Sequence, residues 1–142
     1  MTSAPVADSR VRGVLDSTAI QSYGRGHIHV GEVMSEISTE HAYVGVPATA
    51  LLDAHARFLD DAVARARLEL LVQLPGTRMI DLDADTAGPV AHVVPYAGDD
   101  LARAHAAWAA LYHSAVLFTT EPDKARPAMD ENRIIAIPTE DA

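Results

Sequence analysis

The sequence contains no cysteine, and Lys124 is its single lysine among 142 residues. The absence of cysteine excludes disulfides, zinc–thiolate sites and thiol nucleophiles. No apolar run approaches the roughly 18 residues of a membrane-spanning helix, and residues 1–8 have neither the basic nor the apolar region of a signal peptide. From these absences we expect a cytoplasmic protein with no membrane partner.

Positive charge is also scarce, because 11 basic residues stand against 20 acidic ones and the formal net charge is −9. Nonspecific affinity for nucleic acid comes mainly from neutralising phosphates. A general nucleic-acid binder is therefore disfavoured, and RNA binding would need a local basic patch, a metal ion or a partner. The acidic surplus fits either a soluble surface or carboxylates gathered around a metal.

Aromatic residues make up only 5 % of the chain, but hydrophobic residues make up 49 %. That length and composition suit one domain with a real core, which we expect from 11 to 138 between tails at 1–10 and 139–142. Apolar runs typical of buried strands alternate with helical patterns. We expect strands at 11–15, 42–46, 79–82, 115–119 and 133–137, helices at 16–23, 28–37, 47–58, 60–74, 84–94 and 101–112, and a turn at 121–123. This order predicts an α/β class domain with three α/β/α layers around a mostly parallel sheet.

An acidic residue stands where the first strand gives way to a helix. Gly13-Val14-Leu15 is followed by Asp16, Ser17 and Thr18. An Asp at this point is a common helix N-cap. It also lies at the carboxyl end of a parallel strand, where open α/β sheets bind ligands. Asp16 alone does not distinguish these two interpretations.

Other acidic residues are candidates to join Asp16. Asp53 lies in an apolar stretch where a lone buried carboxylate would be unfavourable, which favours a site. Glu121 follows the strand at 115–119, and Asp99 and Asp100 precede the helix at 101–112, where each by itself could be a turn or cap residue. We expect the strand ends at 16 and 119–121 to lie near each other.

Four segments resemble, in order and spacing, the four motif regions of PIN domains, in particular the small VapC-type toxins of toxin–antitoxin systems. They are VLDSTAIQSY (14–23), VPATALLDA (46–54), DDLARAHAAWAAL (99–111) and LFTTEPDKAR (117–126). The resemblance extends from about residue 11 to 137. It implies a PIN-like domain that cleaves RNA with Mg²⁺ or Mn²⁺, with an antitoxin protein as a further partner and a homodimer as the assembly.

The resemblance also assigns roles to residues. The first acid of the family is Asp16, the second, usually Glu, falls on Asp53, and the last, usually Asp, falls on Glu121. Hard divalent cations prefer oxygen ligands, and two of them about 4 Å apart can activate water and stabilise a leaving oxygen. The residues implied to line the site beside these acids are Ser17, Thr18 and Thr119.

The third acid of the family pattern is replaced here by Arg103. In the leading interpretation, Asp99 or Asp100 supplies the carboxylate from one helical turn earlier. The protein is then a metal-dependent ribonuclease whose metal ligands are Asp16, Asp53, Asp99 or Asp100, and Glu121. In the alternative, the Arg103 guanidinium bridges the acids in place of a metal, and a catalytically impaired PIN-like protein acts through binding or oligomerisation.

Overall fold

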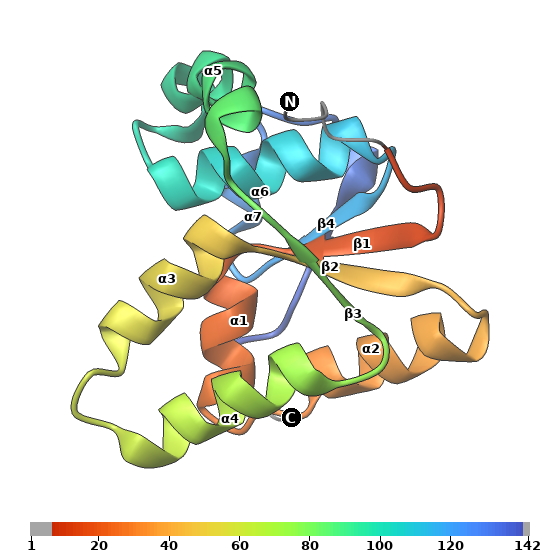
Figure 1. Ribbon diagram of the computed structural model, residues 1–142, viewed down its shortest axis with the longest axis vertical. Helices are drawn as coiled ribbons and strands as arrows, with labels where there is room; N and C mark the ends of the chain where they lie inside the picture. The colour runs from red at the N-terminus through yellow and green to blue at the C-terminus, as the bar shows by residue number, and fades with distance from the viewer. Residues whose placement is uncertain (1–6, 141–142) are drawn as a thin grey trace.

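The computed structural model describes residues 7–140 and contains one five-stranded sheet with the order β3-β2-β1-β4-β5 (Figure 1). Every neighbouring pair of strands is parallel. The strands are β1 (Val11–Leu15), β2 (Tyr43–Pro47), β3 (Thr77–Ile80), β4 (Val116–Thr119) and β5 (Ile134–Ala136). The expectation of a central parallel sheet is confirmed.

Helices cover both faces of this sheet, which gives the three α/β/α layers that the sequence predicts. In Figure 1, α5 and α6 lie on one side of the sheet and α1 to α4 lie on the other. The helices are α1 (Ser17–Gly24), α2 (His29–Thr39), α3 (Ala48–Arg57), α4 (Ala62–Gln73), α5 (Ala84–Val93), α6 (Leu101–Tyr112) and the short α7 (Pro122–Ala125). Two 3₁₀ helices, η1 (Val94–Ala97) and η2 (Glu131–Arg133), complete the order.

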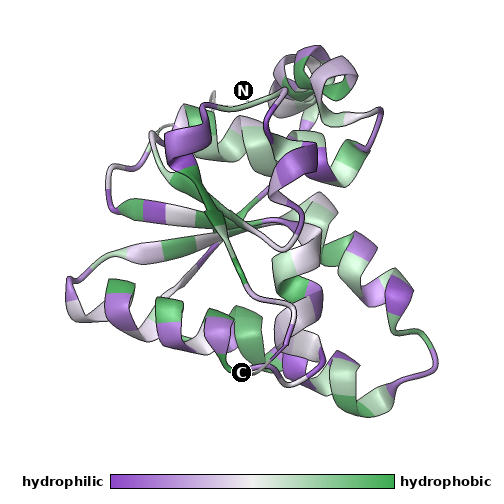
Figure 2. Cartoon of the chain, turned by 180° about the vertical axis from the view of Figure 1, so that it is seen from behind, coloured by the Kyte–Doolittle hydropathy of each residue, from purple (hydrophilic) through white to green (hydrophobic). Residues whose placement is uncertain are grey.

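The sheet separates the two largest clusters of the core. On one side Leu15 packs with Ile20 and Leu68 of the helices, and all three are fully buried. On the other side Val14 and Leu117 pack against the alanine-rich face of α6. Successive strand residues point to opposite faces, so strands buried on both faces appear in the sequence as continuous apolar runs. Figure 2 shows this apolar character in the central strands.

Two differences from the expected elements have a clear cause or change the element type. β3 begins at Thr77, two residues before the expected start, because the chain pairs with β2 directly after α4: the Val44 N–H donates to the Gly76 carbonyl at 2.8 Å. Leu82, expected in the strand, is 44 % exposed. The turn expected at 121–123 is the start of α7.

The N-terminal end of the described chain is attached to the domain. Residues 1–6 and 141–142 of the expected tails lie outside the described residues. The Asp8 N–H donates to Nδ1 of His113 at 2.9 Å, and the Arg10 carbonyl accepts from the Tyr43 N–H at 2.7 Å. Among residues 7–140 there is no helix that is both long and apolar enough to cross a membrane.

Candidate functional site

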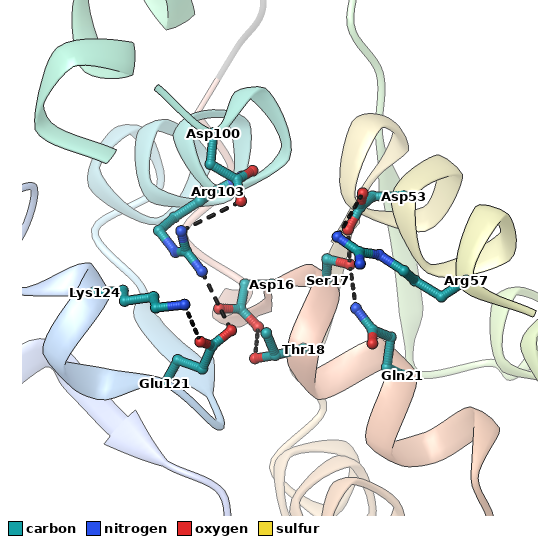
Figure 3. Close-up of a pocket in the computed structure, with 10 residues that line it drawn as sticks. All are labelled: Asp16, Ser17, Thr18, Gln21, Asp53, Arg57, Asp100, Arg103, Glu121 and Lys124. Atoms are coloured by element: carbon teal, nitrogen blue, oxygen red, sulfur yellow. Dashed lines mark hydrogen bonds and ion pairs between the residues drawn. The ribbon is translucent and has the colours of Figure 1, made fainter. Parts of the chain in front are cut away.

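A cavity of about 260 Å³ lies at the carboxyl ends of β1 and β4 (Figure 3). The sheet brings these ends together because β1 pairs directly with β4, and α1 and α7 follow them within three residues. α3 follows β2 at once and borders the same cavity. Four carboxylates line it, Asp16, Asp53, Asp100 and Glu121, together with three cations, Arg57, Arg103 and Lys124.

Asp16 is both the N-cap of α1 and part of the cavity wall. Its Oδ1 accepts the Ala19 N–H at 3.0 Å and the Thr18 hydroxyl at 2.6 Å. Its side chain is buried, and Oδ2 has no hydrogen-bond partner among the described residues. Burial raises the pKa of Asp16, against hydrogen bonds from Thr119 and Thr18 that lower it. Asp16 is therefore shown to be an N-cap, and it lies at the cavity that the second interpretation requires.

Two threonines connect the end of β4 to the start of α1. The Thr18 hydroxyl oxygen accepts the Thr120 N–H at 2.9 Å and lies 3.3 Å from Oγ1 of Thr119. Thr119 is fully buried, and its Oγ1 accepts the Glu121 N–H at 3.0 Å. Thr119 was expected to line the cavity, but it does not. It supports the cavity by holding Glu121 and Thr18 in place.

Asp53 is linked to α1 by a short chain of hydrogen bonds. The Ser17 hydroxyl donates to Oδ2 of Asp53 at 2.6 Å, and Nε2 of Gln21 donates to the Ser17 oxygen at 2.9 Å. Nη2 of Arg57 lies 3.8 Å from the other oxygen, Oδ1. Asp53 lines the cavity, but its side chain is 33 % exposed rather than buried as its apolar neighbourhood suggested. Both of its oxygens have partners.

Arg103 lies between two of the acids. Its side chain is only 10 % exposed, Nη1 donates to Oδ2 of Asp100 at 3.3 Å, and Nη2 donates to Oε1 of Glu121 at 3.4 Å. The ammonium of Lys124 lies 2.6 Å from Oε2 of Glu121. Both oxygens of Glu121 are therefore paired with cations. The Arg103 guanidinium thus bridges Asp100 and Glu121.

Of the two acids before α6, only Asp100 faces the cavity. It is the N-cap of α6, with Oδ1 accepting the Arg103 N–H at 2.9 Å. Asp99 is exposed and does not line the cavity, so it is not placed to be the ligand or catalytic residue that we expected. The physical reason is the backbone: Gly98 and Asp99 have φ angles of 64° and 61°, a left-handed turn into α6.

Three of the four carboxylates in the cavity are already paired in the described arrangement. Asp53, Asp100 and Glu121 each have both oxygens engaged by cations, hydroxyls or backbone N–H groups, whereas the buried Oδ2 of Asp16 has no hydrogen-bond partner among residues 7–140. An incoming ion would have to displace Arg103, which is nearly buried, from the acids it bridges. Within residues 7–140 no group of three or more Asp, Glu or His side chains is arranged to hold a metal.

Sequence reasoning missed Gln21, Arg57 and Lys124 as cavity residues. Each lies three or four residues after a candidate, namely Ser17, Asp53 and Glu121, and this spacing places side chains on the same helix face. The spacing was therefore the available signal. It does not by itself show that the face borders a cavity.

Comparison with known proteins supports the fold. No model of a known protein family matches the sequence, and no curated protein matches it. The solved structure of PAE2754 from Pyrobaculum aerophilum superposes with a TM-score of 0.60 over 88 % of this chain and 83 % of that one. At 15 % sequence identity, this likeness establishes a shared α/β/α fold.

Proposed function

We propose that this chain is a PIN-like protein whose acidic pocket is neutralised by its own cations, and that it acts through association with protein rather than by cleaving RNA. The observation that carries the proposal is the position of Arg103, nearly buried and bonded to both Asp100 and Glu121. The order of the four PIN-like segments and the α/β/α fold support the relationship.

Arg103 can satisfy the charge of the acids but cannot replace the chemistry of a metal. A guanidinium stays protonated at every physiological pH, so it neither binds a water as a Lewis acid nor lowers the pKa of that water. Lys124 and Arg57 add to the neutralisation of Glu121 and Asp53. Such a pocket stabilises the junction of α1, α3, α6 and α7 without a hydrolytic step.

The overall charge supports a protein as the partner. A chain with a net charge of −9 repels phosphates, and the cations of the pocket are already paired with its acids. We therefore propose a protein of the antitoxin type, which the resemblance implies, as a partner in the cytoplasm.

A second candidate is the Mg²⁺- or Mn²⁺-dependent ribonuclease of the same resemblance. One observation favours it: Oδ2 of Asp16 is buried, lies in the cavity wall and has no partner among the described residues. An unpaired carboxylate oxygen in such a position would be stabilised by a cation. Arg57 and Lys124, whose side chains are 63 % and 62 % exposed, could leave the cavity, but Arg103 would also have to move.

Calorimetric titration with Mn²⁺, paired with a cleavage assay on fluorescent RNA, distinguishes the two candidates. We expect the wild-type chain to show neither saturable binding at millimolar Mn²⁺ nor cleavage. Arg103→Asp restores the acid of the family pattern and should gain Mn²⁺ affinity. Arg12→Asp makes the same charge change at an exposed strand position outside the cavity and should gain none.

Wild-type binding that disappears in Asp16→Asn, together with RNA cleavage lost in the same variant, would overturn the proposal in favour of the ribonuclease. A circular dichroism melt of each variant shows that it is folded. Binding gained equally by Arg103→Asp and Arg12→Asp would show a surface effect of charge and would contradict the role assigned to Arg103.

A further inference from the structure

β3 forms one edge of the sheet, and its outer side pairs with no other strand among residues 7–140. In Figure 1 this strand lies in front of the others, nearest the viewer, with α5 above it and α4 below it. Its four residues, Thr77–Ile80, contain no proline, and their pairing with β2 has no bulge. Edge strands that lack these protective features are templates for an added strand.

The register with β2 shows which backbone groups of β3 remain on the outer edge. Val44 pairs with Thr77, and the Val44 N–H donates to the Gly76 carbonyl at 2.8 Å. In a parallel pair each residue directs its N–H and C=O to the same side, and successive residues alternate between the two sides. Arg78 therefore bonds to β2, whereas the N–H and C=O of Met79 point outward and are open to a further strand.

The side chains of β3 leave this edge accessible. Arg78, its charged residue, is directed away from the edge, because its guanidinium lies 4.2 Å from the centre of the Tyr43 ring and 3.3 Å from Oδ2 of Asp8. Met79 lies on the opposite face of the sheet and is 38 % exposed. Its side chain offers an apolar neighbour to the residues of an added strand, and such cross-strand pairs stabilise a sheet.

A second cavity, of about 300 Å³, borders the same edge on the side of the sheet that α5 and α6 cover. Val11 and Ile80 form its floor, and Trp108 of α6 lies in its wall. Gly45 of β2 lies between the two floor residues, where a Cβ would collide with Ile80. The floor is therefore apolar and free of a β2 side chain, which suits the aliphatic stem of a long side chain.

The rim of this cavity carries negative charge that no cation compensates. Asp81 and Asp83 follow β3 directly and line the cavity, and neither forms an ion pair with a lysine or arginine in the described part of the chain. Hydrogen bonds from the side chain and N–H of Thr86 lower the pKa of Asp83, so it is ionised at neutral pH. Arg78, which also lines the cavity, is already paired with Asp8. The rim is thus complementary to a cationic side chain.

We propose that the outer edge of β3 binds an extended basic segment of a partner protein as an added strand. Backbone hydrogen bonds to Met79 give affinity, and the cavity gives specificity for alternate side chains. A lysine or arginine of the added strand crosses β3, lays its stem over the apolar floor and places its charge beside Asp81 and Asp83. The apolar residues between these cations pack beside Met79 on the other face.

The inference rests on the proposed function only in taking a protein as the partner. The edge cavity shares no lining residue with the acidic pocket, so binding at β3 is measured separately from Mn²⁺ binding and RNA cleavage. RNA cleavage by the wild type would overturn the proposed function and leave a positive result at β3 intact. Absence of peptide binding would overturn this inference alone.

NMR titration of the ¹⁵N-labelled full chain with a capped eight-residue peptide of alternating lysine and valine tests the proposal. We expect saturable binding at sub-millimolar concentrations. The Met79 amide signal should shift downfield as the amide gains a hydrogen bond, and its hydrogen exchange should slow by about tenfold. A peptide with glutamate in place of lysine, and a lysine peptide with every amide N-methylated, should each bind at least about tenfold more weakly.

Variants of the rim test the charge. Asp81→Asn together with Asp83→Asn should weaken binding of the lysine peptide by about fivefold, and asparagine at 83 still caps α5. Asp85→Asn removes the same charge from an exposed position of α5 outside the cavity and should leave binding unchanged. Circular dichroism checks that each variant is folded.

Three results would overturn the proposal. The first is binding that leaves the Met79 amide unchanged or that survives N-methylation of the peptide. The second is equal binding of the lysine and glutamate peptides. The third is a Met79 amide that is already protected without peptide and gains protection as the protein concentration rises, because a second copy of the chain would then occupy the edge.

Discussion

Replacing Arg103 by Met should destabilise the protein by about 2 kcal/mol. Methionine keeps an unbranched, helix-compatible stem but removes the charge and both bonds, at 3.3 Å to Asp100 and 3.4 Å to Glu121. Removing one partner from a fully buried ion pair costs about 3–5 kcal/mol. Here Asp100 and Glu121 are 38 % and 35 % exposed, so water compensates for part of the loss. For a domain of this size the melting temperature should fall by about 8 °C.

The effect of Arg103→Met should depend on Asp16. Burial raises the pKa of that carboxyl and the charge of Arg103 opposes the rise, so in the variant Asp16 has a greater tendency to take up a proton. In an Asp16→Asn background the same substitution should therefore be less destabilising, with a coupling free energy of about 1 kcal/mol. Arg103→Lys keeps the charge but not the planar guanidinium. Its free energy of unfolding should lie between those of the wild type and Arg103→Met.

Urea denaturation followed by circular dichroism, on the four members of the cycle, measures these values. The reasoning would be refuted if Arg103→Met changed the free energy of unfolding by less than about 0.5 kcal/mol, the range of ordinary surface substitutions. It would also be refuted if Arg103→Met had the same effect in the wild-type chain and in the Asp16→Asn variant. In both cases Arg103 would not be the counter-ion of the pocket.

Three further predictions concern stability. Burial raises the pKa of Asp16 above its ordinary value of 3.8, so the folded state holds the proton more tightly and wild-type stability falls as pH rises through that raised pKa. The free energy of unfolding of Asp16→Asn relative to wild type, measured in urea, should therefore increase from pH 4 to pH 7, and a difference independent of pH would contradict this. A Cβ at Gly13 would collide with the Phe118 ring, so Gly13→Ala should lower stability by about 1–3 kcal/mol. Gly88 lies in open space inside α5, so Gly88→Ala should raise stability by about 0.5–1 kcal/mol. Equal melting temperatures for the two variants would refute the packing argument. Leu68→Ala empties a fully buried position of α4 and should cost about 2–5 kcal/mol in the same assay, so a loss below about 1 kcal/mol would show that α4 is not packed as described.

The sequence alone determined the architecture and the local caps. Strands buried on both faces leave continuous apolar runs such as Val116–Phe118, and their alternation with helices predicts a parallel sheet. Asp16 and Asp100 are predicted as caps because capping depends on residues three positions away, which the sequence shows directly. The start of β3 was misplaced because pairing with β2, a long-range contact, sets it.

Only the tertiary structure decided which further acids join Asp16 and Glu121 in the cavity and which cations neutralise them. The order β2-β1-β4 brings Asp16 and Glu121 to one edge, in agreement with what adjacent strand ends predict. The choice of Asp100 over Asp99 depends on a left-handed backbone turn. The two partners of Arg103 lie three and 18 residues away. Sequence shows which groups carry charge, but the direction and burial of each side chain, which set its partners, follow from packing across the whole chain.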